Sequence, residues 1–173
     1  ILMFKNICKC FFPTRPINGS HLKWDDVDNK IPLFSLNGQN HVAKVVDVYD
    51  GDSIKIVINL SGTFHKFNCR LAGLDTPELK SHDTSEKLYG HYVKKKVKEL
   101  LLNKIIVVDC QKFDKYGRLL IYIHLNDNVI KIPFNQYIIN QQWAIPYDGR
   151  TKKLWSIHLE QHPELMRRRG VIP

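Results

Sequence analysis

The stretch VAKVVDVYDGDSIKIVINL, residues 42–60, decides the fold class. It contains two runs rich in β-branched residues, Val42–Val48 and Ser53–Leu60, and isoleucine recurs at every second position of the second run. This alternation is typical of a half-buried strand. The two runs flank Tyr49-Asp50-Gly51-Asp52, and an Asp-Gly pair is a strong signal for a hairpin turn. The stretch therefore predicts two antiparallel strands.

The rest of the chain contains further predicted strands and helices. In residues 85–102, apolar side chains recur at three- and four-residue steps with lysines between them, which indicates an amphipathic helix. The further strands expected are Thr63–Leu74, Lys104–Cys110 and Arg118–Leu125, and the helices are Ser85–Leu102, Phe134–Gln142 and Lys152–Gln161. This order is shared by many α+β domains, and it matches a small barrel of the oligonucleotide-binding (OB) type. The expected fold is α+β, mainly β: a five-stranded OB-fold barrel with about three helices and an N-terminal extension.

The first forty residues form the predicted N-terminal extension, and residues 41–173 form the OB-fold domain. Residues 13–30 have the composition of a linker, and Ile31–Gly38 resembles a short strand that ends in a turn. The apolar opening is broken by Lys5 and Lys9, so it does not match a secretory signal. Residues 1–30 are a candidate for attachment to a membrane or particle, with an ordinary flexible arm as the alternative.

Composition excludes several classes of protein. No apolar run approaches the ~18 residues of a membrane span, and with 43% hydrophobic residues the chain can bury a core. The spacing of the four cysteines matches no disulfide-dense secreted scaffold, so we expect reduced thiols and favour an intracellular or virus-associated setting over a secreted one. Nothing indicates an oligomer, and a monomer is the default expectation.

The net charge points to a polyanionic partner. The chain has 26 Lys and Arg against 17 Asp and Glu, a formal charge of +9. Five basic and three acidic residues fall in 1–40, a net +2, which leaves +7 for residues 41–173. Nucleic acid is the first candidate partner and an acidic membrane surface the second. Solvated surface charge is the alternative explanation.

Acidic residues are placed at two turns between expected strands. Asp50 and Asp52 occupy the first turn, and Asp75 and Glu78 the second. A five-stranded barrel can bring these strand ends together, and clustered carboxylates beside a backbone carbonyl suit a hard cation such as Ca²⁺ or Mg²⁺. Taken singly, each Asp is more typical of a residue that makes the local hydrogen bonds of its turn.

Two arginines accompany these carboxylates. Arg70 lies on the strand that leads into the second acidic turn, and Arg118 opens the last strand. Two guanidinium groups near a hard cation are suited to hold a phosphate, because each can bind two oxygens. An arginine at a strand end is otherwise an ordinary surface charge.

Three segments together resemble the signature segments of the staphylococcal-nuclease-like (thermonuclease) family. They are Val45-Val46-Asp47-Val48-Tyr49-Asp50-Gly51-Asp52-Ser53, Cys69-Arg70-Leu71-Ala72-Gly73-Leu74-Asp75-Thr76-Pro77-Glu78 and Asp114-Lys115-Tyr116-Gly117-Arg118-Leu119. They appear in the family's order and with similar gaps, and the resemblance covers about residues 41–160. Ser53 departs from the threonine usual in the family but keeps a hydroxyl group.

The resemblance implies roles for particular residues. It implies that Asp52, Asp75 and the Thr76 carbonyl bind Ca²⁺ directly, and that Asp50 supports these ligands. It also implies that Glu78 reaches the metal through water and is the general base, with a purely shaping role as the alternative. The remaining implied roles are a phosphate clamp, Arg70 and Arg118, and a nucleotide pocket, Lys115, Tyr116 and Tyr147. For Tyr147, ordinary packing at the rim is the alternative.

The expected function is a calcium-dependent phosphodiesterase that hydrolyses DNA and RNA with little sequence specificity and leaves 3′-phosphate ends. The alternative is a nucleic-acid-binding or structural module on the same fold that does not cleave. His158 and His162 are spaced like zinc ligands on a helix, but Glu160 is misplaced for a zinc-hydrolase signature and no third ligand is evident. Arg167, Arg168 and Arg169 are either phosphate contacts or a solvated tail.

Overall fold

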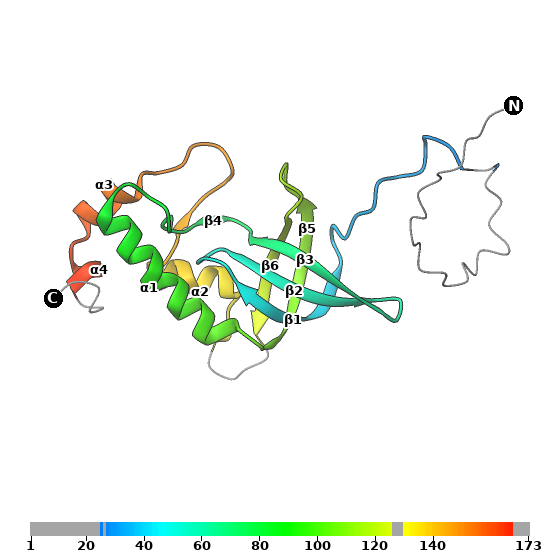
Figure 1. Ribbon diagram of the computed structural model, residues 1–173, viewed down its shortest axis with the longest axis horizontal. Helices are drawn as coiled ribbons and strands as arrows, with labels where there is room; N and C mark the ends of the chain where they lie inside the picture. Colours follow the sequence, from blue (N-terminus) through cyan, green and yellow to red (C-terminus); the bar gives the residue numbers. More distant parts are fainter. Residues whose placement is uncertain (1–24, 26, 126–129, 168–173) are drawn as a thin grey trace, which may run out of the picture. The chain divides into compact units, whose positions relative to one another are not determined.

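The computed structural model describes residues 25, 27–125 and 130–167 (Figure 1). Its contacts divide the chain into two units, Ile1–Phe34 and Ser35–Pro173. All the elements discussed below belong to the second unit. Cys8, Cys10, Arg168, Arg169 and most of residues 1–30 lie outside the described residues, so the attachment role of residues 1–30 stays a prediction.

Five strands form a closed barrel. They are β1 (Asn40–Val48), β2 (Ser53–Leu60), β3 (Thr63–Leu71), β5 (Ile105–Phe113) and β6 (Leu119–Leu125). The order around the barrel is β1-β2-β3-β6-β5, and every neighbouring pair is antiparallel except β3 and β6, which run parallel. The prediction of a five-stranded, mainly β fold is thereby confirmed.

Alternation of side chains builds the barrel interior. Val45, Ile56, Val108, Ile121 and Ile123 are each 0% exposed and come from four different strands. Their removal from water is the main favourable term in closing the barrel. Strands β2 and β3 pair without a shift, from Ser53 opposite Arg70 to Leu60 opposite Thr63.

A second, two-stranded sheet lies beside the barrel. The strand expected over Thr63–Leu74 is wrong in extent, because β3 ends at Leu71 and a turn at Gly73, with φ +78°, redirects the chain. The chain then forms β4 (Leu74–Asp75), which pairs antiparallel with β7 (Ile145–Pro146). This pairing attaches the segment that follows β7 to the segment that carries Asp75.

The described residues contain four helices: α1 (Thr84–Leu101), α2 (Phe134–Asn140), α3 (Trp155–Gln161) and α4 (Glu164–Arg167). Asp83 caps α1 by accepting a hydrogen bond from the Glu86 N–H at 2.7 Å. The buried face of α1 includes Tyr89, whereas Leu88, which the apolar spacing places on that face, is 40% exposed. Helix α3 begins at Trp155, three residues after its expected start at Lys152. None of the described helices has the length and apolar character to span a membrane.

Asn135 joins α2 to the barrel. Its side-chain amide donates to the carbonyls of Ala72 at 2.9 Å and Ile121 at 3.0 Å, and its oxygen accepts from the Ile123 N–H at 3.0 Å. The side chain is buried, so these three bonds satisfy polar groups that water does not reach. Asn135 thus holds the turn before β4 against β6.

The strand expected at Ile31–Gly38 is wrong. These residues have no strand structure, and Leu33 and Phe34 are exposed. Pro32 cannot donate to a strand ladder. Only Leu36 is buried, and the Gly38 N–H donates to the Cys110 carbonyl at 2.8 Å, so the segment ends in a turn against the barrel.

Candidate active site

The turn between β1 and β2 positions two of the carboxylates. Asp50 Oδ1 accepts hydrogen bonds from the N–H groups of Asp52 at 3.1 Å and Ser53 at 2.7 Å. A Cβ at Gly51 would lie 2.7 Å from Val93 Cγ1 and 2.9 Å from Thr76 Cβ. Glycine is therefore required at this turn because α1 and Thr76 approach the backbone closely.

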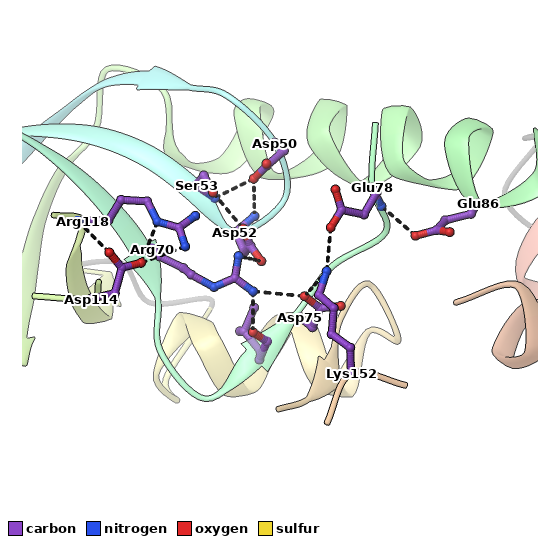
Figure 2. Close-up of polar contacts among 11 residues, drawn as sticks. Asp50, Asp52, Ser53, Arg70, Asp75, Glu78, Glu86, Asp114, Arg118 and Lys152 are labelled. Carbon is purple, nitrogen blue, oxygen red and sulfur yellow. Dashed lines mark hydrogen bonds and ion pairs between the residues drawn. The ribbon is translucent and has the colours of Figure 1, made fainter. Parts of the chain in front are cut away.

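Arg70 lies between the two buried carboxylates (Figure 2). One guanidinium nitrogen is 2.8 Å from Asp52 Oδ2, and the other is 3.0 Å from Asp75 Oδ1. Asp52 and Asp75 are 3% and 1% exposed. Burial opposes the charged guanidinium, but both carboxylates outweigh it, so the pKa of Arg70 lies above its ordinary value.

The two buried carboxylates, Asp52 and Asp75, differ in their hydrogen bonding. Asp52 Oδ1 accepts from the Ser53 hydroxyl at 2.9 Å, whereas Asp75 Oδ2 is buried and has no hydrogen-bond partner among the described residues. Burial and then the charge of Asp50 raise the pKa of Asp52 to about 7, against the opposing effect of Arg70. Burial and the neighbouring Asp50 thus outweigh Arg70 in their effect on the pKa of Asp52.

Glu78 is held at the edge of the site through its backbone. Its N–H donates to Glu86 Oε1 at 3.0 Å, and Glu86 also accepts from the Ser81 hydroxyl at 2.7 Å. A Cβ at Gly90 would lie 2.9 Å from the Pro77 carbonyl, so α1 packs directly on the backbone before Glu78. The Glu78 side chain itself is 60% exposed.

Lys152 contacts two of the acidic residues. Its Nζ is 2.6 Å from Glu78 Oε1 and 3.1 Å from Asp75 Oδ1 (Figure 2). The extended segment after β7 brings it there, and the pairing of β7 with β4 places that segment beside Asp75. Sequence reasoning missed this residue because it assigned Lys152 to the start of a helix.

Arg118 is oriented by the turn before β6. Its Nε and a terminal nitrogen lie 2.8 Å and 2.7 Å from Asp114 Oδ2, and its backbone N–H donates to Asp114 Oδ1 at 2.9 Å. Asp114 is therefore a positioning residue to which the sequence reasoning gave no role. The sequence did offer one signal for Asp114, because this residue opens the third signature segment.

Most of the predicted site residues line one small cavity of about 120 Å³. These are Asp50, Asp52, Arg70, Asp75, Thr76, Glu78 and Arg118. The nucleotide-pocket candidates lie around it. Tyr147 lines a cavity of about 300 Å³ that shares Arg70, and the exposed Tyr116 ring lies 5.5 Å from the Arg118 guanidinium carbon, with Lys115 over its ring.

The donor set fits a hard cation. Carboxylate and carbonyl oxygens are the ligands that Ca²⁺ takes in proteins, and the unpartnered Asp75 Oδ2 is a buried oxygen that a cation would satisfy. Within the described residues, no three His, Cys, Asp or Glu side chains gather as a metal site. A cation here would accordingly rely on two buried carboxylates supplemented by the Thr76 carbonyl.

Residues 68–161, more than half of the chain, match the family described as staphylococcal nuclease homologue. The chain belongs to this family. It is 34% identical over 127 residues to a thermonuclease of Staphylococcus hyicus, covering 72% of this chain and 70% of that one. It is 33% identical over 85 residues to endonuclease YncB of Bacillus subtilis, covering 47% and 38%.

A relative outside these bacteria has no assigned activity. An uncharacterised protein of Methanocaldococcus jannaschii is 29% identical over 169 residues, covering 85% of this chain and 79% of its own. The two relatives above that have a named activity, a thermonuclease and an endonuclease, are both nucleases. The chain is thus a member of a nuclease family.

Proposed function

We propose that this protein is a calcium-dependent phosphodiesterase that hydrolyses DNA and RNA with little sequence specificity and leaves 3′-phosphate ends. The observation that carries the proposal is the shared cavity, in which two buried carboxylates, two arginines and the exposed Glu78 meet. The similarity to thermonucleases and an endonuclease supports it.

Asp52, Asp75 and the Thr76 carbonyl would hold Ca²⁺, supported by Asp50. When bound, the ion supplies positive charge that neutralises phosphate oxygens and polarises the phosphorus.

The protein's own side chains carry the remaining steps. Arg70 and Arg118 each present planar donors that bind phosphate oxygens and stabilise the negative charge that develops on them. Glu78 accepts a proton from the attacking water, for which its exposed carboxylate is suited. Attack on phosphorus breaks its bond to the 5′ oxygen. That oxygen leaves on the downstream fragment as a 5′-hydroxyl, and the phosphate stays on the 3′ oxygen of the upstream fragment.

Low sequence specificity follows from the kind of contact. Arginines hold phosphates, which are the same at every step of the chain, and the rings of Tyr116 and Tyr147 would stack on any base. The net charge of +9 attracts the backbone of either nucleic acid.

The test is cleavage of plasmid DNA and of RNA by the purified protein, with Ca²⁺ and with EGTA. Glu78→Gln should abolish cleavage, whereas Glu160→Gln, at an exposed position on α3, should leave it unchanged. End-group analysis should find 3′-phosphates. Binding of DNA without any cleavage by the wild type would refute the proposal in favour of a non-catalytic module.

A further inference from the structure

The contacts of Lys152 conflict with the roles proposed for its two carboxylate partners. Its Nζ lies 2.6 Å from Glu78 Oε1 and 3.1 Å from Asp75 Oδ1. A carboxylate oxygen that is held by an ammonium group is a poor acceptor for a proton from water. A cation bound at Asp75 would also repel Lys152, because two positive charges would then share one carboxylate. Lys152 must therefore leave these partners before the proposed reaction can begin.

The surroundings of Lys152 allow it to change partners. Its side chain is 42% exposed, and residues 151–154 form neither helix nor strand. The backbone is held on both sides of this segment, by the pairing of β7 with β4 and by the buried Trp155 at the start of α3. Lysine carries its charge on a long, flexible stem. The ammonium group can therefore move by rotation of the side chain while the backbone on either side stays in place.

The two arginines of the site already have carboxylate partners. Arg70 lies 2.8 Å from Asp52, and Arg118 lies 2.7 Å from Asp114. Figure 2 shows Arg118 and Lys152 at opposite ends of this group of side chains, with Arg70 between them. A phosphate held by the arginines would thus have a third cation within reach at the other end of the group. This third cation is the one whose partners a bound metal ion would take over.

We propose that Lys152 exchanges partners: it holds Asp75 and Glu78 in the calcium-free protein, and it binds the substrate phosphate in the calcium-bound protein. The inference rests on the proposed nuclease function and adds to it a third cationic contact to the phosphate. It also means that Glu78 Oε1 is blocked in the calcium-free protein and becomes free to accept a proton only when Lys152 leaves.

Chemical labelling of lysines in the wild-type protein tests the exchange. Acetylation by an N-hydroxysuccinimide ester needs an amine that no carboxylate holds, and peptide mass spectrometry measures the extent at each lysine. Lys152 should be labelled slowly in EGTA and about fivefold faster with Ca²⁺. Adding thymidine 3′-monophosphate, which carries the phosphate end that the proposed reaction leaves, should slow its labelling again. Lys153, the exposed neighbour, is the internal control and should be labelled equally in all three conditions.

Substitution of Lys152 gives a second measurement. With saturating Ca²⁺, Lys152→Met should weaken binding of thymidine 3′-monophosphate about tenfold in a calorimetric titration. Lys152→Arg keeps the positive charge and should weaken binding less than about threefold. Lys153→Met removes the same charge from the next residue and should leave the affinity unchanged.

Three results would overturn the proposal. Labelling of Lys152 that does not respond to Ca²⁺ would show that the side chain stays with its carboxylates. Equal affinities of Lys152→Met and the wild type for the nucleotide would show that Lys152 does not bind phosphate. An equal loss of affinity in Lys153→Met would assign the effect to net charge. In each case, calcium-dependent cleavage and its loss in Glu78→Gln would still stand, so failure here is distinct from failure of the proposed function.

Discussion

Replacing Asn135 with leucine should destabilise the protein without greatly changing side-chain volume. The Asn135 amide makes three hydrogen bonds in a buried place. The Ile121 carbonyl keeps a second donor, the Ala72 N–H at 2.9 Å, so it stays satisfied. The Ile123 N–H and the Ala72 carbonyl instead lose the Asn135 partner.

The magnitude follows from those two groups. Each buried polar group left without a partner costs about 1–3 kcal/mol, and the added apolar surface of leucine offsets part of this. We therefore expect the free energy of unfolding to fall by about 3 kcal/mol and the melting temperature by about 10 °C.

Urea unfolding followed by circular dichroism measures this change, with calorimetry for the melting temperature. Gln136→Leu is the matched control. Gln136 is the next residue on α2, it is exposed, and its amide donates to Asn140 at 2.8 Å within the same helix. The control should change the free energy of unfolding by less than about 0.5 kcal/mol. A loss below about 1 kcal/mol at Asn135 would refute the reasoning.

Three further predictions concern the site and the core. Lys152→Met should raise the affinity for Ca²⁺ several-fold, because it removes a positive charge from beside Asp75 and Glu78. Calorimetric titration measures the affinity, and Lys153→Met is the control. A fall in affinity would contradict this prediction. Gly90→Ala should lower the cleavage rate about tenfold, because the new methyl group displaces the Pro77 backbone just before Glu78. The free energy of unfolding should change less than the activation free energy for cleavage. Unchanged cleavage kinetics would count against that contact. Burial and then Asp109 raise the pKa of Cys110 to about 11, so iodoacetamide at pH 8 should label Cys110 only after unfolding, as peptide mass spectrometry can show.

The barrel and the carboxylate cluster were predictable because their signals are local. Alternating isoleucines mark β2 whatever it pairs with, and acidic turns at strand ends can be read without knowing which strands meet. The same local reading attributed Gly51 to turn conformation. The structure shows a different reason, the close approach of Val93 and Thr76, which only the folded chain reveals.

The remaining features depend on distant partners. Strand β7 is two residues long and contains a proline, so no periodicity in the sequence can indicate it. It forms because Leu74 and Asp75 offer a backbone edge with which it can pair. Lys152 reaches Glu78 only through that pairing. Asn135 is one of three amide side chains on α2, so nothing in the sequence marks it as the buried one, and its partners near residues 72 and 121–123 could not be named from the sequence.

The parallel pairing of β3 with β6 has a consequence for the newly made protein. Cys69 to Leu71 pair with Leu119 to Ile121, and this seam brings Arg70 and Arg118 to the same end of the barrel. A chain on the ribosome that has completed β3 must wait for some fifty more residues before the second arginine can join the first. The cavity that both arginines line can therefore form only once the last strand of the barrel has been made and paired with β3.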